Sequence, residues 1–125
     1  MIAARWQRAE GAMVALAGLG MAVATRPGWP WWAWMLIFLA PDLAMAGYGA
    51  GPRIGAAIYN AVHLYGLALL LALLGVVSGL PLLIALGGLW LAHIGIDRAL
   101  GFGLKSPEGF GVTHLGRIGR DQPPG

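Results

Sequence analysis

Four long apolar stretches dominate the chain and limit the folds that it can adopt. They run over about residues 9–25, 31–50, 54–77 and 81–99. Each approaches the roughly 20 apolar residues that a helix needs to cross the hydrocarbon core of a bilayer. Of the 125 residues, 58% are hydrophobic and 10% are charged, against about 25% charged in an average soluble domain. We therefore expect an all-α integral membrane protein, a four-helix transmembrane bundle with up-down topology.

Proline and glycine separate the four stretches. Breaks are expected at Arg26–Pro30, at Gly51-Pro52 and at Ser78–Pro81, because such runs form turns and end helices.

Arg5 and Arg8 before an apolar core also resemble the start of a signal peptide, but Glu10 at the edge of that core favours a retained helix.

The helices and the segment after them are predicted to form a single membrane domain over residues 1–120. Residues 101–120 have no helical period and are rich in glycine. We expect them to form an irregular tail packed at the cytoplasmic mouth of the bundle. Residues 121–125 are expected to be disordered.

Positive charges gather on one side of the predicted bundle. With the N-terminus in the cytoplasm, the outer side holds Arg26 alone, and the inner side holds seven basic residues: Arg5, Arg8, Arg53, Arg98, Lys105, Arg117 and Arg120. This bias places both termini in the cytoplasm of a multi-pass protein of the bacterial inner membrane. The net charge of +3 does not indicate nucleic-acid binding, because the basic residues flank apolar segments and there meet membrane lipids.

Six polar residues lie within the apolar stretches: Glu10, Asp42, Asn60, His63, His93 and Asp97. An ionisable group at the centre of a membrane helix costs about 2.5–3.5 kcal/mol even on lenient insertion scales, so such groups usually mark a site. With a helical rise of 1.5 Å per residue, all but Glu10 lie about 6–16 Å from the cytoplasmic ends of their helices. We therefore expect one polar layer in the cytoplasmic half of the bundle.

Spacing within the stretches supports a shared site. His93 and Asp97 are four residues apart, so both can reach one ion from the same helix face. Pro41 removes a backbone hydrogen bond to the Ile37 carbonyl and should kink the second helix beside Asp42. Small residues at Gly47, Gly51 and Gly55 should let the second and third helices approach closely.

A divalent metal is one predicted occupant of this layer. Asp42, His63, His93 and Asp97 are the candidate ligands for zinc, iron or manganese, with Asp42, His93 and Asp97 as candidate catalytic groups. Seven further residues are candidates for supporting the ligands or binding substrate: Glu10, Asn60, Arg53, Arg98, Lys105, His114 and Arg117.

Several motifs resemble a family of small bacterial membrane proteins known as domain of unknown function 4260. They are PDLAMAGY from Pro41, GPRIG from Gly51, YNAVHLY from Tyr59, HIGIDRALGFGLK from His93 and THLGRIG from Thr113. The resemblance covers about residues 8–120. It implies a membrane location and four helices, includes the segment around His114 in the domain, and brings no established activity.

Three functions remain open from the sequence. In the first, the polar layer is the centre of a metal-dependent enzyme that acts on a lipid or lipid-like substrate, with metal-activated water as the nucleophile. Alternatively, the chain is a binding module for lipid, quinone or a haem held by His63 and His93. In the third reading it is a structural, accessory or transport protein whose polar residues form a packing or proton-relay network. Transport would require a homo-oligomer, because four helices are too few for the usual repeat-built transporter.

Overall fold

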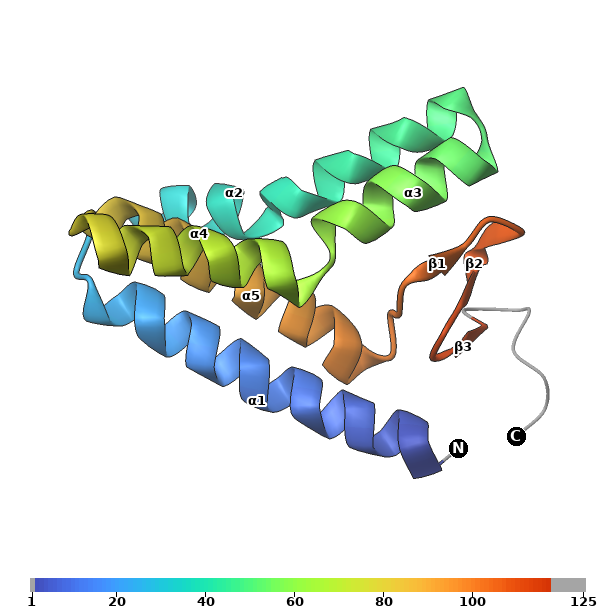
Figure 1. Ribbon diagram of the computed structural model, residues 1–125, viewed down its shortest axis with the longest axis horizontal. Helices are drawn as coiled ribbons and strands as arrows, with labels where there is room; N and C mark the ends of the chain where they lie inside the picture. The colour runs from blue at the N-terminus through green and yellow to red at the C-terminus, as the bar shows by residue number, and fades with distance from the viewer. Residues whose placement is uncertain (1, 118–125) are drawn as a thin grey trace.

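The computed structural model of the protein describes residues 2–117 (Figure 1). The helices are α1 (Ile2–Ala24), α2 (Trp31–Leu39), η1 (Ala40–Ala50), α3 (Pro52–Val62), α4 (Tyr65–Ser78) and α5 (Pro81–Leu100). The tail contains three short strands, β1 (Lys105–Ser106), β2 (Gly109–Thr113) and β3 (Gly116–Arg117). The predicted disorder of residues 121–125 lies outside the described residues, as does Arg120.

Three helical runs in the described part are long and apolar enough to cross a membrane: Trp31–Ala50, Pro52–Ser78 and Pro81–Leu100. They indicate a membrane protein. The helix α1 has 23 residues but does not meet the same criterion. It begins several residues before the predicted apolar stretch and includes Arg5, Arg8 and Glu10.

The helix α5 lies at the centre of the fold, between α1 and α4 (Figure 1). Small residues bring the three backbones together. A Cβ atom added to Gly95 would lie 2.5 Å from the backbone nitrogen of Ala15, and one added to Gly87 would lie 2.6 Å from that of Ala72. Neither position can hold a side chain without moving a helix, so close backbone packing joins α5 to both neighbours.

The second helical run changes character at Pro41, as the sequence predicts. The α-helix α2 ends at Leu39, and the chain continues as the 3₁₀-helix η1. Eleven residues are an unusually long 3₁₀ segment, since most such segments have three or four. Two of the three predicted small residues lie where η1 meets α3, because a Cβ at Gly47 would meet Ile58 and one at Gly55 would meet Tyr48. Gly51 instead forms the turn, with a φ angle of 110°.

The third run is also broken, which was not predicted. The helix α3 ends at Val62, His63 is its C-cap, and α4 begins at Tyr65 after an extended Leu64. The hairpin of η1 and α3 consequently diverges from the pair of α1 and α5. The strands lie at the end of the fold where these two pairs of helices separate (Figure 1).

The prediction of an all-α fold with an irregular tail was wrong for residues 105–117. They form a three-stranded antiparallel sheet in the order β1-β2-β3. Lys105 pairs with Thr113, and Val112 pairs with Arg117. The strands are too short and too rich in glycine to show the alternating pattern by which a strand is predicted.

Candidate metal centre

Four side chains converge at one point in the interior: Asp42, His63, His93 and Asp97. Each offers a ligand atom, and these atoms all lie within 4.8 Å of one another. The His93 Nε2 atom lies 3.1 Å from an Asp42 oxygen and 3.3 Å from an Asp97 oxygen. The His63 Nε2 atom lies 3.7 Å and 3.5 Å from the same two oxygens. The structure therefore brings together the four residues that the sequence suggested as ligands, while their binding of a metal stays a prediction.

Two of these side chains, those of Asp42 and His63, lie where a helical run is interrupted. Asp42 lies near the start of η1, just after Pro41, and His63 lies at the break between α3 and α4. The unbroken helix α5 supplies His93 and Asp97 from adjacent turns of one face. The site is thus built where irregular backbone meets the central helix.

Hydrogen bonds orient both imidazoles. His63 donates its Nδ1–H to the carbonyl of Tyr59 at 2.8 Å, and His93 donates its Nδ1–H to the carbonyl of Phe38 at 2.7 Å. A carbonyl oxygen can only accept, so the proton of each neutral ring must lie on Nδ1. Both Nε2 lone pairs therefore face the cluster, with 3.3 Å between the two nitrogens.

The carbonyl that holds His93 is made available by Pro41. In the 3₁₀ pattern of η1, the Phe38 carbonyl would accept from the N–H of residue 41. Proline has no N–H. The Phe38 oxygen therefore serves the His93 ring instead. The sequence predicted a freed carbonyl beside Asp42 but assigned it to Ile37, which accepts from the N–H of Ala40.

Two side chains of α5 satisfy the carbonyls that the break at His63 exposes. The Trp90 indole N–H donates to the Val62 carbonyl at 2.7 Å, and Arg98 donates to the His63 carbonyl at 2.8 Å. Carbonyls at a helix end in an apolar setting need such partners. The role of Trp90 was missed, although its position three residues before His93 places it on the same helix face.

The separations match a four-coordinate ion better than a haem. Bonds of about 2.0–2.1 Å in a tetrahedral zinc site set neighbouring ligand atoms about 3.3–3.4 Å apart. Five of the six separations range from 3.1 Å to 3.7 Å, and the sixth, between Asp42 and Asp97, is within 4.8 Å. A porphyrin ring does not fit between two nitrogens that are 3.3 Å apart and flanked by carboxylates.

Burial falls across the cluster from the imidazoles to the carboxylates. The side chains of His63 and His93 are 0% and 3% exposed, that of Asp97 is 17% exposed, and that of Asp42 is 37% exposed. The candidate metal centre is therefore accessible from outside the protein on the side of Asp42.

Asn60 and Lys105 lie beside the cluster. The Asn60 amide accepts from the Lys105 N–H at 2.6 Å and donates to the Lys105 carbonyl at 2.8 Å, which ties β1 to α3. The Lys105 side chain is buried, and burial lowers the pKa of its amine. Its ammonium lies 5.1 Å from the centre of the Tyr59 ring, which stacks on His63 at 3.8 Å.

The other predicted supporting residues lie away from the ligands. Glu10 and His114 line a separate cavity of about 210 Å³ with Arg98, and Arg53 is exposed in the first turn of α3. His114 is not among the four clustered residues, and its Nδ1 accepts the Leu104 N–H at 2.8 Å. The Arg117 side chain lies outside the described part of the structure.

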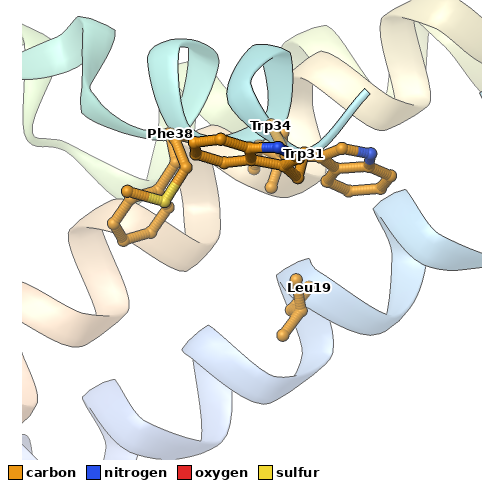
Figure 2. A pocket seen from close by; sticks show the side chains of 6 residues that line it. Leu19, Trp31, Trp34 and Phe38 are labelled. Atoms are coloured by element: carbon orange, nitrogen blue, oxygen red, sulfur yellow. The ribbon is translucent and has the colours of Figure 1, made fainter. Parts of the chain in front are cut away.

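An apolar pocket is lined by Phe38, which also contacts the cluster. Its volume is about 350 Å³, within the range of ligand-binding pockets. Figure 2 shows Trp31, Trp34 and Phe38 of α2 facing it, with Leu19 of α1 across from them. The Phe38 ring also packs against His93, with 5.3 Å between ring centres. One residue thus borders both the pocket and the candidate metal centre.

Comparison with known families identifies the chain. It belongs to the family described as domain of unknown function (DUF4260), whose model matches residues 4–118. No curated protein and no solved structure matches it. The family assignment confirms the resemblance seen in the sequence and supplies no activity.

Proposed function

We propose that this DUF4260 member is a metal-dependent membrane enzyme whose centre is one divalent cation held by Asp42, His63, His93 and Asp97. Zinc fits best, because it favours mixed imidazole and carboxylate ligands, and five of the six ligand separations lie near the tetrahedral value. Iron and manganese are the alternatives.

The orientation of the two imidazoles carries this proposal. Because both Nδ1–H groups are bound to backbone carbonyls, the neutral cluster presents two nitrogen lone pairs and two carboxylates to one another. Four acceptors at such distances repel unless a cation lies between them. A ring N–H fixed by a carbonyl is also the usual support of a metal-binding histidine.

The burial gradient supports a catalytic centre over a closed structural one. Catalytic zinc sites keep one position open for water, whose pKa the metal lowers to about 7. Asp42 is the most exposed of the four groups, so it would yield that position most easily and then accept a proton from the water. The apolar pocket bordered by Phe38 suits the hydrocarbon part of a lipid-like substrate.

We also propose that α1 is a fourth membrane span. It lies antiparallel along α5, since Gly11 approaches Gly95 and Gly18 approaches Ala92. The outward side chains of Met13 and Leu16 are 69% and 72% exposed, which suits contact with lipid. An α1 that follows α5 through a bilayer gives the up-down bundle expected from the sequence.

The distribution of charge supports cytoplasmic termini. The N-terminus of α1, the turn before α3 and the end of α5 lie toward one end of the fold (Figure 1). Basic residues concentrate there, and Arg26 lies toward the other end. Under the positive-inside rule, this distribution supports an orientation with that end and both termini in the cytoplasm of a bacterial inner membrane.

Metal content of the protein purified in detergent tests the central proposal. The wild type should hold one metal ion per chain, and His63→Ala or His93→Ala should lose it. The matched control is His114→Ala, which removes the third histidine of the chain from outside the cluster and should retain the ion. A wild type that takes up no stoichiometric zinc, iron or manganese would overturn the proposal.

One observation favours a second candidate, a metal-free packing network. Arg98 and Lys105 are both buried near the cluster, so two cations can balance the two carboxylates. In that case a histidine variant would lower the stability of the protein and leave its metal content at background.

A further inference from the structure

We propose that the cavity between Glu10 and Arg98 binds the zwitterionic headgroup of a membrane lipid, with phosphoethanolamine as the chemistry that fits it. The cavity has a volume of about 210 Å³ and lies between α1, the start of α4, the end of α5 and the tail. None of the candidate metal ligands lines it, so this inference goes beyond the metal centre and does not depend on it. Seven residues form the lining: Gln7, Glu10, Leu64, Tyr65, Arg98, Leu104 and His114.

The depth of the cavity in the fold is the first observation. Arg98 lies in the last turn of α5, at the end of the candidate span Pro81–Leu100. A Cβ atom added to Gly11 would meet the Arg98 side chain, so Glu10, the preceding residue of α1, lies beside the same end of that span. A membrane-spanning helix ends where the hydrocarbon core gives way to lipid headgroups. The cavity is therefore at the level of headgroups rather than of acyl chains.

The two charged groups that line the cavity are the second observation. Glu10 contributes a carboxylate from α1, and Arg98 contributes a guanidinium from α5. Within residues 2–117 the Glu10 carboxylate forms no ion pair or hydrogen bond, so the cavity, and not a direct salt bridge, lies between the two groups. A ligand with one positive and one negative charge complements this pair. Three other charged side chains near this end of α5 do not line the cavity: Arg8, which donates to the Ala99 carbonyl, Asp97 and Lys105.

The Arg98 guanidinium retains donors for a ligand. A guanidinium carries five N–H groups. Arg98 uses one on the carbonyl of His63 and one on that of Phe102, so three remain within the described part of the chain. The same two bonds hold the guanidinium in place. A fixed guanidinium with several N–H groups is well suited to the oxygens of a phosphate.

Two neutral side chains of the lining can also donate to a phosphate. The Tyr65 ring lies against Arg98, with 5.7 Å from the guanidinium carbon to the ring centre, and its hydroxyl is a donor. The Nδ1 atom of His114 accepts the Leu104 N–H, so the neutral ring carries its proton on Nε2 and donates there. The Glu10 carboxylate can only accept, which suits an ammonium with its three N–H groups. A quaternary choline nitrogen has no N–H to offer, so ethanolamine fits better.

The test measures lipid binding to the full-length protein in detergent by native mass spectrometry. Dioleoyl phosphatidylethanolamine and dioleoyl phosphatidylglycerol are titrated separately, so the acyl chains are identical and only the headgroup differs. The wild type should bind its first molecule of the ethanolamine lipid at least about threefold more tightly, because the glycerol lipid offers Glu10 no cationic partner.

Substitutions at Glu10 separate ligand binding from a structural role. Glu10→Gln should lose most of the preference, and Glu10→Lys should reverse it in favour of the anionic lipid. The matched control is Glu108→Gln, which removes an exposed carboxylate from outside the cavity and should keep the wild-type preference. Tyr65→Phe should weaken both lipids to a similar extent, because it removes a donor to the phosphate that they share. Arg98 is left unchanged, since it also supports the helix break at His63.

The outcomes decide both the site and the source of its ligand. Equal binding of the two lipids by the wild type, or the same preference in Glu10→Gln and Glu108→Gln, would overturn the proposal. Free phosphoethanolamine is titrated as well. Much weaker binding of this headgroup than of the whole lipid would support a membrane lipid as the ligand. Equally tight binding with the same dependence on Glu10 would overturn the lipid as the source and identify a soluble zwitterion.

Discussion

Pro41 links local backbone chemistry directly to the candidate site. It lacks the N–H that would occupy the Phe38 carbonyl, and that carbonyl binds the Nδ1–H of His93. It also lies immediately before Asp42 at the start of η1. One residue therefore helps to set the tautomer of one candidate ligand and the position of another.

Pro41→Ala should weaken metal binding about tenfold, since losing an outer partner of a metal-binding histidine costs about 10–100-fold in affinity. The new N–H competes with His93 for the Phe38 carbonyl. The measurement is competition for Zn²⁺ with a chelator of known affinity. Pro81→Ala is the matched control, because Pro81 occupies the first position of α5, where no N–H partner is expected. Equal zinc affinity in Pro41→Ala and wild type would contradict this role.

At the scale of elements, the sequence allowed much of the arrangement to be predicted, but not its irregular parts. Long apolar stretches, the Pro41 interruption and the face shared by His93 and Asp97 all follow from composition and spacing. The break at His63 could not be predicted, because no proline or glycine marks it. The break depends on Trp90 and Arg98 of α5, which is distant in the sequence. These two side chains donate hydrogen bonds to the backbone carbonyls that the break exposes. Tertiary contacts of this kind leave no local pattern.

The docking of the tail should depend on pH through His114. Its Nδ1 must be unprotonated to accept the Leu104 N–H, and burial lowers the pKa of the ring below its ordinary value of about 6.5. The undocked tail then binds a proton more readily than the docked tail. Docking therefore has its full stability above pH of about 6.5 and loses stability as the pH falls below it.

Hydrogen exchange of the Leu104 amide, corrected for intrinsic rates, measures this effect. Protection should fall between about pH 7.5 and 5.5 in the wild type. In His114→Gln, whose amide oxygen can accept without titrating in this range, protection should be flat. Parallel curves for the two proteins would show that another group controls the docking.

At the scale of the whole molecule, small residues determine how closely the outer helix approaches the centre. Gly11, Ala15, Gly18 and Ala22 form the buried stripe of α1, and it faces α5. Because α5 carries His93 and Asp97, the position of α1 also bears on the centre. Close backbone contact between α1 and α5 thus stabilises the fold, while the larger apolar side chains of α1 point outward.

Substitutions of two glycines on α1 test the importance of the contact between α1 and α5. Gly18→Val should destabilise the fold by about 1–3 kcal/mol through overpacking, because a Cβ there would lie 2.8 Å from the backbone nitrogen of Ala92. Gly20→Val makes the same change where nothing lies within 4 Å of the added Cβ. Unfolding in detergent should separate the two variants, and equal stability would contradict close packing of α1 on α5.

X-ray absorption of the zinc-loaded protein tests the central claim most directly. The account predicts about four nitrogen or oxygen neighbours at about 2.0 Å, with the outer-shell scattering of two imidazoles. The double variant His63→Ala/His93→Ala should lose that imidazole signal, and His114→Ala should keep it. A zinc ion surrounded by oxygen alone, or a spectrum unchanged in the double variant, would contradict a metal centre at Asp42, His63, His93 and Asp97.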